Sequence, residues 1–140
     1  MESDTVTLTI ARQQGGALLS SAHELIGVKV DAIAHAKSDR GDERARRIDL
    51  RRHRTELLQA RRLAGELERV VHQREPRELT SSRQLLDEVV ASALVVESQA
   101  LADAAVVSSS GSDVGDLAVR CHRVEALVAA LATVRGTKTR

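Results

Sequence analysis

Hydrophobic side chains recur along most of this chain at steps of three and four residues, the spacing that gathers them on one face of an α-helix. The pattern predicts four helices, at about residues 17–36, 43–72, 80–107 and 113–134. Short segments rich in Gly, Ser, Asp or Pro separate them, as turns require. We therefore expect an all-α protein, a four-helix bundle built from two long helical hairpins.

The first residues follow a different pattern. Residues 5–10, TVTLTI, alternate polar and apolar positions and are rich in β-branched side chains, which is typical of a strand. A single strand in a helical chain has no partner, so it would pair with another copy or another protein, or would instead be the start of a helix. Gly15 and Gly16 then separate this extended segment from the first helix. The expected organisation is an N-terminal segment at 1–16, one helical-bundle domain at 17–135 and a tail at 136–140.

Two of the predicted helices carry an apolar seam with heptad spacing. The seam residues are Leu50, His53, Leu57, Leu67 and Val71 in the second helix, and Val114, Leu117, Val124, Val128 and Leu131 in the fourth. We expect both seams to lie against other helices, either inside one bundle or across a homodimer. His53 is polar, so it could set the register of an interface, make it sensitive to pH, or lie satisfied near the bundle end. Cys121 also falls on the fourth-helix seam and is expected to be a small core residue.

The third helix has apolar positions on more than one narrow stripe, so we expect it to be the central and most buried helix. Ser81 and Gln84 have the spacing of a capping box at its start. The Thr-Leu-Thr sequence at residues 7–9 resembles the Glu-Leu-Thr sequence at residues 78–80, and a helix follows each. This similarity suggests two related hairpins, at residues 5–73 and 78–135.

The composition narrows the range of functions. The 140 residues are 42% hydrophobic and 29% charged with a formal net charge of +1, values typical of one folded domain. There is no aromatic residue, which excludes base stacking on aromatic rings and aromatic cages for ammonium ligands. The single cysteine cannot form an internal disulfide. No signal-peptide pattern and no apolar run near membrane-spanning length is evident, so we expect a cytoplasmic protein without membrane contact, and the Arg-, Ala- and Val-rich composition suggests a GC-rich bacterial source.

A basic stripe runs along one side of the second helix. It consists of Arg40, Arg44, Arg47, Arg51, Arg54 and Arg61. Such a stripe could follow the phosphates of a nucleic acid, bind an acidic protein partner, or face the acidic third helix within the chain or across a dimer. It could equally be a solvated face with intrahelical ion pairs such as Glu43–Arg47. The nearly neutral chain lacks the positive excess that is usual in nucleic-acid-binding proteins.

One short segment resembles a known functional motif. Ala22-His23-Glu24-Leu25-Ile26-Gly27 is similar to the phosphoacceptor segment of histidine phosphotransfer domains, typically Ala-His-x-Leu-Lys-Gly on a helix of a four-helix bundle. The resemblance implies that His23 is a candidate phosphoacceptor. Ile26 stands where that pattern has lysine, and Lys29 is not on the same helix face as His23. The segment also resembles the His-Glu-Leu of kinase dimerisation helices, but the proline expected after it is missing.

The remaining polar residues give no motif for catalysis, metal binding or a cofactor. Histidines and Cys121 lack metal-ligand spacing, and no phosphate-binding loop or nucleophile elbow is present. The sequence therefore favours a non-enzymatic helical-bundle interaction or adaptor module that associates with itself or another protein. The alternatives are a nucleic-acid-associated protein that uses the basic stripe and a phosphotransfer domain that uses His23. No small-molecule substrate is evident.

Overall fold

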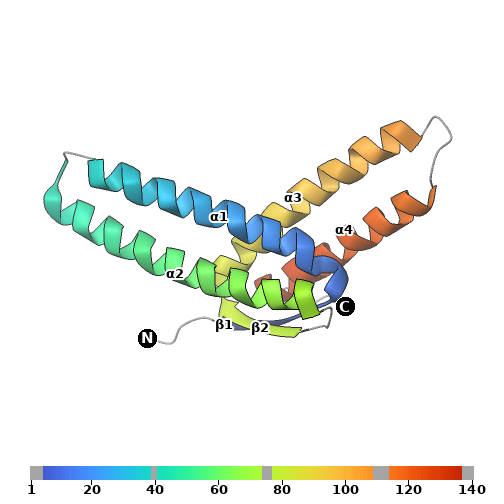
Figure 1. Ribbon diagram of the computed structural model, residues 1–140, viewed down its shortest axis with the longest axis horizontal. Coiled ribbons are helices and arrows are strands. Elements are labelled where there is room, and N and C mark those ends of the chain that lie inside the picture. Colours follow the sequence, from blue (N-terminus) through green and yellow to red (C-terminus); the bar gives the residue numbers. More distant parts are fainter. Residues whose placement is uncertain (1–4, 39–40, 74–76, 109–113, 137–140) are drawn as a thin grey trace.

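A computed structural model describes residues 5–38, 41–73, 77–108 and 114–136 of the chain. The elements in order are β1 (Thr5–Ile10), α1 (Arg12–Ser38), α2 (Glu43–Gln73), β2 (Arg77–Ser82), α3 (Arg83–Ser108) and α4 (Val114–Arg135). Helices α1 and α2 form one antiparallel hairpin and α3 and α4 form the other. The hairpins cross near the small sheet and diverge from it like the arms of a V (Figure 1). The predicted helical bundle of two long hairpins with an extended N-terminal segment is confirmed.

The two strands pair with each other. They form an antiparallel two-stranded sheet in which Leu8 lies opposite Leu79, and Thr7 lies opposite Thr80. The hydroxyls of Thr7 and Thr80 share a hydrogen bond of 2.8 Å. The prediction that β1 would find no partner in its own chain was wrong, because the chain returns to the base of the V after α2 and lays β2 beside β1.

The same strand–helix–helix order occurs twice, with matching spacing. The second strand, third helix and fourth helix begin 72, 71 and 71 residues after β1, α1 and α2, respectively. In the antiparallel sheet Leu8 and Leu79, which hold equivalent places in the two units, lie opposite each other, as a pseudo-twofold axis at this pair requires. The packing is exchanged accordingly, since α2 contacts β2 and α4 contacts β1. The two similar segments, 7–9 and 78–80, are thus paired with each other at the centre of the sheet.

The core lies at the base of the V, where the hairpins cross above the sheet. It contains Leu8, Ile10, Leu18, Ala22, Ala60, Leu63, Ala64, Leu67, Val70, Leu79, Leu85, Leu86, Val89, Val90, Ala93, Leu127 and Val134. These side chains are all aliphatic, so close helix packing replaces the bulk that aromatic rings would supply.

Helix α1 begins five residues before the predicted Ala17. Gly15 and Gly16 lie inside this helix instead of separating it from the strand. A Cβ on Gly15 would lie 3.0 Å from Cγ1 of Val70 and 3.2 Å from Cγ2 of Val71. Glycine is thus tolerated in the helix because it lets α1 and α2 approach closely at the base of the V.

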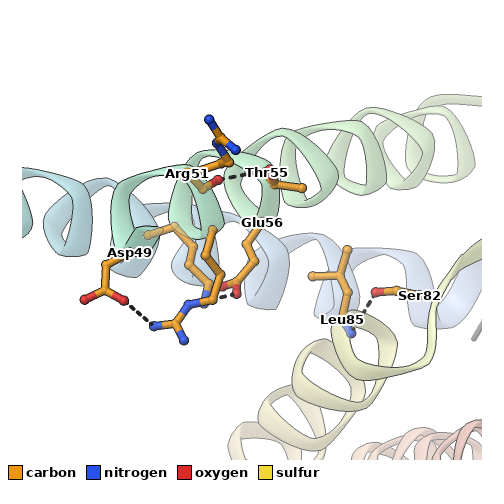
Figure 2. Close-up of polar contacts among 8 residues, drawn as sticks. Asp49, Arg51, Thr55, Glu56, Ser82 and Leu85 are labelled. Carbon is orange, nitrogen blue, oxygen red and sulfur yellow. Dashed lines mark hydrogen bonds and ion pairs between the residues drawn. The ribbon is translucent and has the colours of Figure 1, made fainter. Parts of the chain in front are cut away.

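Helix α3 differs from its prediction at its start and in its burial. Strand β2 continues through Ser82, and the amide of Leu85 donates a 3.2 Å hydrogen bond to Ser82 Oγ, so Ser82 caps the helix instead of Ser81 (Figure 2). Burial is confined to the first half of α3, from Leu85 to Ala93. The expectation that α3 would be the central and most buried helix therefore holds only for its first half, because α3 leaves the core at the crossing.

Hydrogen bonds and an ion pair join the helices at the base of the V. Ser21 of α1 donates a buried 2.7 Å hydrogen bond to the carbonyl of Val89 in α3. Arg135 of α4 donates to both carboxylate oxygens of Asp87 at 2.9 and 3.3 Å, and Arg83 donates to the carbonyl of Val134. The hydrogen bonds from Arg135 lower the pKa of Asp87 and outweigh the effect of its partial desolvation.

Candidate interaction surface

Beyond the crossing, each hairpin continues as a two-helix arm with no core of its own. We define the α1–α2 arm as residues 23–59 and the α3–α4 arm as residues 94–126. Among the side chains that the structure describes in these two ranges, none is buried. The last buried residues before the arms are Ala22 and Ala93, at equivalent places in the two units. Two helices can cover only one side of each other, so the remaining apolar positions of an arm stay in contact with water.

Both arms expose large aliphatic side chains. Those exposed by 43–74% of their area are Val28, Val30, Ile48 and Leu58 on the α1–α2 arm, and Val95, Val96, Val106 and Val119 on the α3–α4 arm. Ile48 and Val119 hold equivalent places on α2 and α4, and both are more than half exposed. Scattered apolar residues are ordinary on a protein surface, whereas a concentration of them on two helices is typical of interaction surfaces.

On α2 the exposed apolar residues lie among the arginines of the basic stripe. One shallow depression is lined by Arg44, Arg47, Ile48, Arg51 and Arg52. The next is lined by Arg47, Leu50, Arg51, Arg54, Thr55 and Leu58. This face of α2 therefore offers both apolar contact and positive charge, a combination that suits a partner with apolar and acidic side chains.

Most stripe arginines are available for a partner. Arg47 pairs with Glu43 at 3.0 Å, as predicted, but Arg44, Arg51, Arg54 and Arg61 form no ion pair with any residue that the structure describes. Arg51 points away from the side of α2 that carries Asp49 and Glu56 (Figure 2). Within the described ranges, none of the stripe residues forms an ion pair with an acidic side chain of α3. The prediction that the stripe faces α3 therefore remains only for α3 of a second copy. Arg40 lies outside the described residues.

The predicted seams run along the inside of the hairpins and are buried to different degrees. Leu67 is 1% exposed. Leu50, His53, Leu57 and Val71 on α2 and Leu117, Val124 and Leu131 on α4 are half-buried. Val128 is 51% exposed, so the expectation of a fully covered seam was wrong there. The Val114 side chain lies outside the described part of the chain.

Two seam residues with polar or reactive side chains behave differently from expectation. Nδ1 of His53 is buried and has no hydrogen-bond partner among the described residues, so this histidine is not satisfied by the bundle. Cys121 is exposed instead of belonging to the core. Both positions lie in the arms, where the second pair of helices that a complete bundle would need is missing.

His23, the candidate phosphoacceptor, has a side chain that is 55% exposed. Its Nε2 lies 3.7 Å from the Glu68 carboxylate, and Lys29 pairs with Glu56 instead of approaching it. A carboxylate beside the imidazole would repel an incoming phosphoryl group, whereas phosphotransfer needs a nearby cation. Phosphotransfer stays a prediction that this geometry does not favour.

An open cleft of about 450 Å³ lies where the hairpins cross. It brings Glu24 of α1, Glu97 of α3 and Arg123 of α4 to one place, beside Ser20 and Ser21. The hydroxyl of Ser21 is already donated to Val89, and the described lining contains no histidine or cysteine that could act as base or nucleophile. Among the described residues, no group of His, Cys, Asp and Glu side chains is arranged to hold a metal ion.

Helix α3 has a longer apolar segment than we expected from the sequence. Its Arg83–Val106 segment is long and apolar enough to cross a membrane by length and composition, which corrects the expectation that no segment of the chain would be. Only 17% of its most apolar window is buried inside the molecule. The exposed part is the outer half of α3, on the α3–α4 arm.

Comparison of the chain with protein-family models, with curated proteins and with solved structures found no match.

Proposed function

We propose that this chain is a non-enzymatic protein–protein interaction module that associates with itself through its two arms. The observation that carries the proposal is that residues 23–59 and 94–126 contain no buried side chain in their described parts while exposing eight large aliphatic ones. A second hairpin laid on an arm would complete a four-helix bundle and cover these side chains. Each fully covered Val, Leu or Ile contributes about 1.5–3 kcal/mol, and association costs about 4–15 kcal/mol of translational and rotational freedom, so most of these side chains must be covered together.

Sedimentation velocity of the full chain, from micromolar to millimolar concentration, tests this proposal. We expect the mass to rise above the 15.1 kDa of one chain as the concentration increases. A single species of 15.1 kDa at every concentration would contradict self-association. The experiment should be made at two salt concentrations, because the charged arms would make association sensitive to screening.

A second candidate function is supported by the unpaired arginines of the basic stripe. Arg44, Arg51, Arg54 and Arg61 lie along one helix without ion pairs to described residues, as phosphate-binding side chains often do. A gel shift with duplex DNA tests it. Binding through four phosphate contacts would give a slope of log K against log salt of about −3 to −4. An absent or salt-insensitive shift would contradict nucleic-acid binding.

A further inference from the structure

Two exposed helix faces on different arms have the same residue spacing. On α2, Ile48, Arg51, Thr55 and Leu58 follow at steps of three, four and three, and all four are exposed. On α3, Val96, Gln99, Asp103 and Val106 follow at the same steps, and all four are exposed. Each set therefore forms one line along its helix, with an aliphatic residue at either end.

The aliphatic ends match in distance. Ten residues separate Ile48 from Leu58, and ten separate Val96 from Val106, which is about 15 Å along an α-helix. These four side chains are 61%, 65%, 57% and 74% exposed, respectively. Laid against each other, the two lines would cover both pairs of aliphatic side chains at once.

The polar residues decide the direction of the match. If the helices run antiparallel with Ile48 against Val106, then Arg51 faces Asp103, Thr55 faces Gln99 and Leu58 faces Val96. If the helices run parallel, Arg51 faces Gln99 and Asp103 faces Thr55, so no ion pair forms. Among the described residues, Arg51 forms no ion pair and Asp103 accepts a single side-chain hydrogen bond, of 3.0 Å from Gln99. The antiparallel register therefore provides a partner for both charges.

The net charges of the two arms favour pairing of α2 with α3 over pairing of α2 with α2. Counting described side chains without histidine, the α1–α2 arm carries eight basic and six acidic residues, and the α3–α4 arm carries two and four. Two α2 faces brought together would oppose their arginine stripes, which costs free energy through like-charge repulsion. An α2 face against an α3 face joins arms of opposite net charge.

We propose that α2 of one copy packs antiparallel on α3 of a second copy, and that a twofold axis repeats the contact to give a closed dimer. The proposal rests on the proposed self-association and names its two surfaces. Helix α2 runs from the tip of its arm to the sheet, and α3 runs from the sheet to the tip of the other arm (Figure 1). Antiparallel pairing thus places tip on tip, and each copy uses its α2 face and its α3 face once.

Disulfide trapping tests the register directly. In the full chain with Cys121→Ala, one preparation carries Thr55→Cys and another carries Gln99→Cys. We expect the mixture to form an oxidised cross-linked dimer that contains both proteins, and each preparation alone to remain mostly uncross-linked. Efficient cross-linking of the Gln99→Cys protein with itself would show an α3–α3 contact and would overturn the proposal.

A charge exchange tests the Arg51–Asp103 contact independently. Arg51→Glu and Asp103→Arg are each expected to raise the dimer dissociation constant about tenfold or more, since each substitution alters two symmetric contacts, and the double variant should recover most of the loss. Lys37→Glu, the same change of charge on the exposed surface of α1, is the matched control and should leave dimerisation unchanged. All three residues are exposed, so helix content by circular dichroism should be preserved.

The outcomes separate the two proposals. A chain that is monomeric under all conditions contradicts both. A dimer that shows neither the Thr55–Gln99 cross-link nor the charge rescue contradicts only the α2–α3 contact. Co-sedimentation of a monomeric chain with uncharged lipid vesicles, lost on Val96→Ser, would assign the α3 face to a membrane and would also overturn the dimer.

Discussion

Leu8 and Leu79 lie directly opposite each other in the two-stranded sheet, and each is only 3% exposed. Each lies in the strand with which a strand–helix–helix unit begins. The helices of both units pack over this pair of leucines at the base of the V. The contact holds together two segments more than seventy residues apart in the chain. The stability of the molecule should therefore depend on it.

Replacing Leu79 by Ala should lower the free energy of unfolding by about 2–5 kcal/mol, because it leaves a cavity under both hairpins. Urea denaturation followed by circular dichroism measures this loss. Thr80→Ala is the control, since Thr80 is exposed and loses only the hydrogen bond to Thr7, worth about 1 kcal/mol or less. Equal losses in the two variants would show that Leu79 is not the buried anchor.

Gly15→Ala and Gly16→Ala should have opposite effects. A Cβ at Gly16 meets nothing within 4 Å, so alanine there should stabilise the helix by about 0.5–1 kcal/mol. A Cβ at Gly15 would press on Val70 and Val71, and overpacking of this kind costs about 1–3 kcal/mol. Thermal denaturation should give a raised midpoint for Gly16→Ala and a lowered one for Gly15→Ala; a rise in both would refute the close approach of α1 and α2.

Ser21→Ala should destabilise the crossing of the hairpins by about 1 kcal/mol, because the buried hydrogen bond to the Val89 carbonyl is lost. Ser20→Ala, one residue away on the exposed side of α1, is the matched control and should change stability by less than about 0.5 kcal/mol. Chemical denaturation of both variants provides the comparison. If the two substitutions proved indistinguishable, the hydrogen bond would not contribute.

The Asp87–Arg135 pair should add stability that depends on pH. The pKa of Asp87 is lowered in the folded chain, so its contribution is complete above the ordinary aspartate pKa and is lost as the pH falls through the lowered value. Arg135→Gln should return the pKa of Asp87 towards its ordinary range, as an NMR titration of the carboxyl carbon would show. The stability difference between the variant and the parent chain should disappear in strong acid; a constant difference at every pH would contradict the ion pair.

His53→Leu should stabilise the folded chain by about 1 kcal/mol or more, because it removes a buried nitrogen that has no hydrogen-bond partner among the described residues. His122→Leu is the control, since that side chain is 80% exposed and should have nearly no effect. Calorimetry of the two variants and the parent measures the change. A loss of stability in His53→Leu would show that the histidine makes a contact that the structure does not reveal.

The surface residues of the candidate site were partly predictable. The arginine stripe follows from helical periodicity alone, because residues on one helix face are fixed by their spacing. The matching line on α3 was missed because its members were assigned to a buried helix. Its mixed content of Val96, Gln99, Asp103 and Val106, with two polar residues inside an apolar helix, was the available signal.

The amino-acid sequence by itself predicted the four helices and the two hairpins, because helical periodicity and turn residues act over a few neighbouring positions. Its alternation at residues 5–10 favoured an extended segment there but left the start of a helix open, because a strand also depends on a pairing partner. Strand β2 was not predictable in this way. Its sequence, RELTSS, does not alternate, and it becomes extended through pairing with β1 across the chain. Only the tertiary structure decided burial as well: Val89 is 2% exposed and Val96 is 57% exposed although they lie seven residues apart on one face of α3, because α3 leaves the crossing between them. Local spacing fixes which residues share a face, whereas the place where two hairpins cross fixes which part of that face is covered.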